Sequence, residues 1–241
     1  MLRSVFIAFW SLVVTGFFSA AAIVASLPDS SGEGAFRVAR LWARSLLFPT
    51  GIKVNVRGLS NIRPGRPYIF MSNHQSNFDI PILITHLGAS FRWLAKAELF
   101  RIPLFGLAIK RSGYISIDRS NRKAAIASLR QAASIIRSGT SVSIFPEGTR
   151  SRDGRIHPFK KGGFILAVDA GVPVVPIVIH GTWPIMSKNR LMIRPGPVNV
   201  EIFPPVNASD YTRKNKDLLQ ARIEKTIQEG FQKYERGCPS C

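Results

Sequence analysis

Short apolar runs and longer amphipathic stretches alternate along most of the chain. Segments with the apolar period of a helix separate several of the short runs, at Ile80–Leu87, Leu99–Arg111, Arg122–Arg137 and Phe164–Ala170. The order predicts an α/β fold with a mixed, partly parallel sheet flanked by helices. The predicted strands, rich in β-branched or apolar residues, are Lys53–Arg57, Tyr68–Ser72, Arg92–Lys96, Tyr114–Asp118, Ser141–Phe145, Val172–Ile179 and Val198–Phe203.

The last amphipathic stretch predicts a closing helix over Lys216–Tyr234. Its apolar residues recur at every fourth position, so one face of the helix is expected to pack on the body of the protein. The chain contains no internal repeat, linker or low-complexity segment. We therefore expect a single domain over residues 51–241, preceded by a membrane anchor over residues 1–50.

The longest apolar run lies near the N-terminus. Val5–Leu27 is 23 residues without a charge, which as a helix is roughly 34 Å long and exceeds the ~30 Å of a hydrocarbon core. This run predicts a membrane segment. The alternative is a signal peptide, which Arg3 and the small residues at Ala22–Ala25 favour, although the run is longer than the usual apolar region of such a peptide.

A basic amphipathic helix is expected directly afterwards, over Phe36–Phe48. Its arginines, Arg37, Arg40 and Arg44, recur at helical spacing. The helix either lies on an anionic membrane or packs on the domain as an ordinary surface helix. Because these arginines follow the apolar segment closely, the positive-inside rule predicts a membrane-associated protein with the bulk of its chain on the cytoplasmic face. We expect the membrane to be a bacterial-type inner membrane.

Composition and charge narrow the class of partner. Lys and Arg number 33 against 14 Asp and Glu, a net charge of +19, which favours nucleic acid, a membrane surface or a phosphorylated substrate. The 46% hydrophobic content argues against a disordered chain, and two cysteines argue against a disulfide scaffold. Cys238 and Cys241 form a terminal C-x-x-C without a second ligand pair, which favours an inert tail over a metal or redox site.

A candidate acid–base pair follows the predicted strand Tyr68–Ser72. His74 lies on the loop after this strand, and Asp79 comes just before a helix. A carboxylate folded back onto the imidazole would fix its tautomer and leave the other nitrogen free to take a proton from a substrate hydroxyl. The alternatives are a helix N-cap for Asp79 and a satisfied loop histidine for His74. No serine lies in a G-x-S-x-G elbow, so we expect His74 to activate a substrate hydroxyl directly.

A candidate phosphate site follows the predicted strand Ser141–Phe145. A glycine turn at Gly148 presents Thr149 and Arg150, and an arginine fork beside hydroxyl and backbone donors is what a phosphate needs. Glu147, among these cations, is expected to be paired, ionised and hydrogen-bonded so that it holds the loop.

Two more cations, Arg119 and Lys96, each follow or end another predicted strand. A single basic residue in so basic a chain is more often a solvated charge. Their common place at strand ends favours a role in the site, because sites gather there in α/β folds.

Four ordered blocks of this chain resemble a known family. The first is Asn-His-Gln-Ser-Asn-Phe-Asp at 73–79, and the second is Gly-Tyr-Ile-Ser-Ile-Asp-Arg at 113–119. The third is Phe-Pro-Glu-Gly-Thr-Arg at 145–150, and the fourth is Val-Pro-Val-Val-Pro-Ile at 172–177. They resemble the signature blocks of the glycerolipid acyltransferases, in particular the 1-acyl-glycerol-3-phosphate acyltransferase family, over a match from Pro67 to His180.

The resemblance implies a role for each block. His74 is implied as a general base that Asp79 assists, and the fourth block, around Pro173 and Pro176, is implied to support the site and acyl binding. The residues implied to shape the phosphate and acceptor site are Arg119, Glu147, Gly148, Thr149 and Arg150, with Lys96 implied less directly.

The implied reaction moves a fatty acyl group from acyl-CoA or acyl carrier protein to the free hydroxyl of lysophosphatidic acid, giving phosphatidic acid for phospholipid biosynthesis. Neither a metal nor another cofactor is implied, and no covalent acyl-enzyme. The implied partners are membrane lipids, the lysophospholipid acceptor and the acyl donor, and not nucleic acid.

Two alternatives remain at this point. Related enzymes use the same chemistry on glycerol-3-phosphate or a lyso-ornithine lipid. A non-enzymatic polyanion-binding protein would explain the charge. It would explain neither the order of the four blocks nor the apolar N-terminus.

Overall fold

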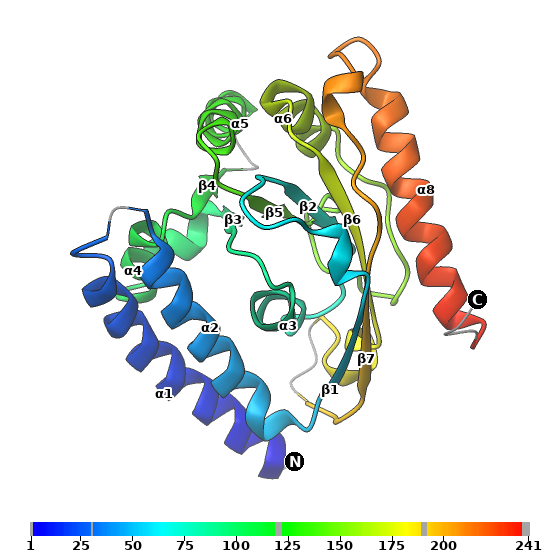
Figure 1. Ribbon diagram of the computed structural model, residues 1–241. Helices are drawn as coiled ribbons and strands as arrows, with labels where there is room; N and C mark the ends of the chain where they lie inside the picture. Colours follow the sequence, from blue (N-terminus) through cyan, green and yellow to red (C-terminus); the bar gives the residue numbers. More distant parts are fainter. Residues whose placement is uncertain (1, 30, 119–121, 189–191, 238–241) are drawn as a thin grey trace.

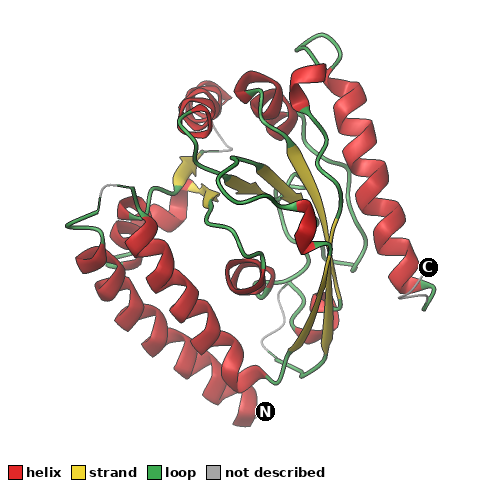
Figure 2. Ribbon diagram, in the orientation of Figure 1, coloured by secondary structure: helices red, strands yellow, loops and turns green. Residues whose placement is uncertain are grey.

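A seven-stranded sheet of order β1-β7-β6-β2-β5-β3-β4 forms the centre of the molecule (Figures 1 and 2). The computed structural model describes residues 2–29, 31–118, 122–188 and 192–237. Its strands pair in parallel except for β6 and β7, which are antiparallel, so the predicted mixed, partly parallel sheet is confirmed. The strands are β1 (Lys53–Arg57), β2 (Ile69–Ser72), β3 (Arg92–Lys96), β4 (Ile115–Ile117), β5 (Val142–Ile144), β6 (Val174–His180) and β7 (Pro197–Ile202).

Helices cover both faces of the sheet (Figure 1). Helices α2 and α3 pack on one face, and α5, α6 and α8 pack on the other. The short α7 was not predicted from the sequence. The helices are α1 (Leu2–Ala25), α2 (Glu33–Leu47), α3 (Asp79–His86), α4 (Phe105–Arg111), α5 (Arg122–Arg137), α6 (Gly162–Ala170), α7 (Thr182–Ile185) and α8 (Lys216–Glu235).

Alternation along the strands produces two apolar layers, one on each face of the sheet. In and beside β2, Ile69 and Met71 belong to the layer under α5, α6 and α8, whereas Tyr68 and Phe70 belong to the layer under α2 and α3. Successive side chains of a strand point to opposite faces, so a strand buried on both sides is apolar at every position. β2 is buried at all four positions, and its first three residues are apolar.

The expected helix over Leu99–Arg111 is wrong in its first half. A short 3₁₀ helix covers Ala97–Arg101, and α4 begins only at Phe105. Pro103 explains the break, because proline cannot donate the backbone hydrogen bond that would continue a helix. The next residue, Leu104, has a φ of +61°, so the chain reverses sharply before α4.

Helices α1 and α2 run antiparallel along one side of the molecule (Figure 1). Two indoles link them: Trp10 Nε1 donates to the Ser45 carbonyl at 2.8 Å, and Trp42 Nε1 donates to Thr15 Oγ1 at 3.0 Å. Of the described helices, α1 is long and apolar enough to cross a membrane. Its exposed side is strongly apolar, with Leu2, Val5, Phe6, Phe9, Leu12, Val13, Phe17 and Val24 in contact with solvent.

Candidate active site

The ends of three parallel strands meet at one edge of the sheet and carry the candidate site. His74 follows β2, the segment 145–150 follows β5, and Lys96 ends β3. A cavity of about 620 Å³ opens at this edge, lined by His74, Lys96, Gly148, Thr149 and Arg150 among others. Arg119, Cys238 and Cys241 lie outside the described residues.

The His74–Asp79 pair is formed. His74 Nδ1 lies 2.8 Å from Asp79 Oδ2, and the same oxygen accepts the backbone N–H groups of Gln75 at 2.7 Å and Ser76 at 2.9 Å. An ionised carboxylate only accepts, so the proton of this bond lies on Nδ1 and Nε2 is left with its lone pair. Nε2 has no hydrogen-bond partner within the described chain, and the His74 side chain lines the cavity.

The alternative of Asp79 as a helix N-cap is wrong. Asp79 is the first residue of α3, and Phe78 occupies the cap position without a side-chain hydrogen bond. The Asp79 carboxylate is fully buried and turns back to the loop that precedes the helix. It therefore holds the loop conformation and the imidazole together rather than the first turn of α3.

Aromatic stacking fixes the plane of the imidazole. The His74 ring stacks on Phe145 with 3.8 Å between centroids and 8° between planes, and Phe145 stacks in turn on Trp93 at 4.9 Å. The His74 side chain is only 13% exposed. The pair is thus oriented before any substrate binds, which general-base catalysis favours.

Glu147 joins the histidine loop to a second loop. Its two carboxylate oxygens accept the backbone N–H groups of His74 at 2.7 Å and His157 at 3.0 Å, as expected for a residue that holds the loop. The expected pairing with cations is wrong: Glu147 is buried, and no Lys or Arg of the described segments forms an ion pair with it. Burial raises the pKa of the Glu147 carboxyl to about 7, so it is not held ionised.

Replacing Glu147 by glutamine should remove a pH dependence of stability. The folded carboxyl keeps its proton up to about pH 7, whereas the same group ionises near 4.5 when exposed. The wild-type free energy of unfolding should therefore fall relative to that of Glu147→Gln as the pH rises between these values, by an amount on the order of 3 kcal/mol, and stay level above them. Thermal denaturation of both proteins from about pH 4 to about pH 8 measures this; a constant difference would contradict it.

Cationic and hydroxyl groups gather at the mouth of the cavity. Gly148 takes a φ of +75°, which favours glycine, and so allows the turn that brings Thr149 and Arg150 to the cavity wall. Lys188 lies there too, and its Nζ donates to Thr149 Oγ1 at 2.8 Å. Lys96 also lines the cavity and pairs with Glu98 at 2.8 Å.

Among the residues of this cavity that sequence reasoning missed are Lys188 and Trp93. Lys188 comes after β6, whose parallel pairing with β2 puts its end at the same edge of the sheet. Once β6 and β2 are taken as neighbours, the cations that follow β6 become candidates by the rule of strand ends that singled out Lys96. No sequence signal marks Trp93, because a tryptophan in a buried strand is ordinary core. Across the described ranges, no three His, Cys, Asp or Glu side chains gather as a metal site.

Comparison with known proteins places the chain in a class. A family model described as "Acyltransferase" matches residues 53–180, more than half of the sequence. The chain therefore belongs to the acyltransferase family, and the resemblance drawn from the four blocks is confirmed.

Relatives of the chain within this family include 1-acyl-sn-glycerol-3-phosphate acyltransferases. It is 38% identical over 174 residues to a chloroplastic one of Brassica napus, covering 71% of this chain and 50% of the relative. It is 34% identical over 192 residues to the alpha form of Homo sapiens, covering 79% and 68%. The crystal structure of the 1-acyl-sn-glycerophosphate (LPA) acyltransferase PlsC from Thermotoga maritima matches with a TM-score of 0.84 at 28% identity, covering 97% of this chain and 95% of that one. The chain spans about half the length of the chloroplastic relatives.

Proposed function

We propose that the protein transfers a fatty acyl group from a thioester donor, acyl-CoA or acyl carrier protein, to the free hydroxyl of lysophosphatidic acid, giving phosphatidic acid. The observation that carries the proposal is the His74–Asp79 pair, set at a cavity that has cations at its mouth and an apolar interior. These three features match the hydroxyl, the phosphate and the hydrocarbon chain of one amphiphilic acceptor. The names of the relatives support the same acceptor.

The chemical step follows from the free nitrogen of His74. Nε2 takes the proton of the acceptor hydroxyl as its oxygen attacks the thioester carbonyl carbon. The tetrahedral intermediate then expels the thiolate, which takes the proton back from the imidazolium. The Asp79 carboxylate, 2.8 Å from Nδ1, stabilises the imidazolium while it carries that proton.

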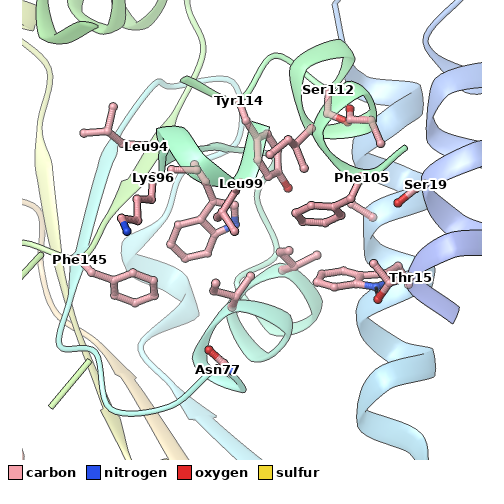
Figure 3. A pocket seen from close by; sticks show the side chains of 18 of the residues that line it. Thr15, Ser19, Asn77, Leu94, Lys96, Leu99, Phe105, Ser112, Tyr114 and Phe145 are labelled. Atoms are coloured by element: carbon pink, nitrogen blue, oxygen red, sulfur yellow. Dashed lines mark hydrogen bonds between the residues drawn. The ribbon is translucent and has the colours of Figure 1, made fainter. Parts of the chain in front are cut away.

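The interior of the cavity is suited to hydrocarbon. Figure 3 shows Lys96 and Phe145 on one side of the cavity and Thr15 and Ser19 of α1 on the opposite side. Side chains from α1, α2, α3 and α4 enclose the space between them, so an acyl chain placed there is removed from water, at about 0.8 kcal/mol per buried methylene. The apolar lining includes Phe18, Ala22, Ala39, Trp42, Ile80, Ile84, Phe105, Ala108 and Ile109.

Replacing Arg150 by lysine should weaken acceptor binding. The guanidinium offers a rigid two-pronged donor beside Thr149 and Lys188, and lysine keeps the charge but loses the fork. Hydrogen bonds to charged groups are worth about 1.5 to 3 kcal/mol, so KM for the acceptor should rise roughly 10- to 150-fold with little change in KM for the donor. Kinetics with both substrates varied measure this. The control is Arg213→Lys, because Arg213 is exposed and pairs with Asp169. A defect confined to the acyl donor would move Arg150 to the donor site.

Initial rates with a panel of acceptors test the proposed function itself. Purified protein with labelled acyl-CoA should acylate lysophosphatidic acid in preference to glycerol-3-phosphate and lyso-ornithine lipid. A preference for one of the other two acceptors would keep the chemistry and change the substrate. Retention on nucleic acid without acyl transfer to any acceptor would contradict the proposal.

We further propose that α1 and α2 form the membrane anchor and lie along one leaflet, on the cytoplasmic face. Both ends of α1 are tied to the domain: Ser4 Oγ accepts the N–H of Ile193 at 3.0 Å, and Ala22 lines the cavity. These contacts favour a helix that lies along the membrane over one that crosses it, and a retained helix over a signal peptide. The arginines of α2 support contact with anionic headgroups.

A further inference from the structure

The indole nitrogen of Trp93 is a buried donor in the cavity wall that has no partner among the described residues. Trp93 lies on β3, is 4% exposed and lines the cavity, and its Nε1–H donates to no acceptor within the described residues. An indole N–H can only donate. A buried donor left without an acceptor costs about 1 to 3 kcal/mol, so the position favours a ligand that carries an acceptor oxygen.

The Trp93 indole is held in place by its neighbours. It stacks on Phe145 with 4.9 Å between centroids and 22° between planes, and it packs edge-on against Phe91 with 5.4 Å between centroids. These contacts oppose a rotation of the indole toward another partner. The Phe145 ring also stacks on the imidazole of His74, so one phenyl ring separates Trp93 from the base.

The geometry points to an ester carbonyl, and we propose that Trp93 Nε1 donates a hydrogen bond to the ester carbonyl oxygen of the acyl chain already present on the acceptor. This inference rests on the proposed function. The acceptor's phosphate belongs with the cations at the mouth, and its hydrocarbon chain has no acceptor atom. Its ester lies on the carbon next to the one that carries the hydroxyl, which His74 deprotonates. Trp93 and His74 are likewise close together, because only the Phe145 ring separates them. Trp93 is thus a residue that distinguishes a 1-acyl from a 1-alkyl acceptor.

An ether analogue of the acceptor tests this directly. 1-O-Alkyl-glycerol-3-phosphate of the same chain length keeps the phosphate, the hydroxyl and the chain but has no carbonyl. Wild-type protein should prefer the ester by about 2- to 12-fold in kcat/KM, the worth of one neutral hydrogen bond. Trp93→Phe, which keeps an aromatic ring on Phe145, should lose activity only with the ester. The ratio of its kcat/KM for the ester to that for the ether should therefore be close to one.

The matched control is Trp183→Phe. Trp183 also has a buried Nε1 without a partner in the described part of the chain, but it packs against Gly154 and does not line the cavity. Its replacement should leave the ester preference unchanged.

An equal loss with both acceptors in Trp93→Phe would overturn the inference, because it would assign the indole to the acyl donor or to packing. Equal kcat/KM values of wild-type protein for the ester and the ether would also overturn the inference. This comparison needs no variant, so the test does not depend on the folding of Trp93→Phe. Failure of wild-type protein to acylate either lipid, with transfer to another acceptor, would contradict the proposed function instead.

Discussion

Replacing His74 by alanine should reduce kcat by about 10²- to 10⁴-fold, the usual worth of a general base. The side chain is the group at the cavity whose free nitrogen can take the acceptor's proton, and Asp79 already fixes its other nitrogen. KM for the acceptor should change little, because we propose that Arg150 and its neighbours, and not His74, hold the phosphate. Initial rates at saturating substrates, together with thermal denaturation, measure both effects.

His157→Ala is the matched control for this variant. His157 also pairs with an aspartate, Nε2 to Asp153 Oδ1 at 3.0 Å, but the pair is about half exposed and does not line the cavity. Its loss should leave kcat within a factor of about two, as for surface changes in general. Wild-type turnover in His74→Ala would remove His74 from the mechanism.

Changing Asp79 to asparagine should be nearly as severe, with a loss of kcat of up to about 10⁴-fold, as for the corresponding change in serine protease triads. An amide that turns its oxygen to the loop can still accept from the backbone of Gln75 and Ser76, but it lacks the charge that stabilises the imidazolium. Turned the other way, it presents an NH₂ group to Nδ1 and selects the wrong tautomer.

Stability measurements separate catalysis from structure in this variant. Because the Asp79 carboxylate is fully buried and one of its oxygens accepts three hydrogen bonds, Asp79→Asn should also lower the melting temperature. Asp153 Oδ1 accepts three hydrogen bonds as well, but its side chain is half exposed, so Asp153→Asn should affect neither property strongly. A variant that lost stability and kept its specific activity would show that Asp79 serves the loop alone.

The strand pattern was enough to bring the main groups of the site together. Parallel strands put their carboxyl ends at one edge, so His74 after β2 and Arg150 after β5 had to be neighbours once β2 and β5 paired. Periodicity carries this information because it marks where each strand ends along the chain. The broken helix before α4 could have been foreseen from Pro103 alone.

Burial at the scale of single atoms could not be predicted. Glu147 sits among cations in the sequence, yet its backbone turns the carboxyl inward to two N–H groups, and the arginine that follows Thr149 turns to the cavity. Asp79 likewise precedes a helix, as a capping residue does, but its side chain turns back to the loop. Tertiary packing decides which of two neighbouring donors a side chain accepts from, and the spacing of residues along the chain does not predict the outcome.

Helix α1 has two apolar faces with different neighbours. One is exposed, while Phe18 and Ala22 line the cavity on the other. With α1 in a leaflet, as we propose, a lysolipid would reach the cavity by lateral diffusion, and its effective concentration would be its mole fraction in the lipid layer rather than its bulk concentration. Dilution of the acceptor by other lipids would then lower the rate at a constant total amount of acceptor, and turnover would follow the composition of the membrane.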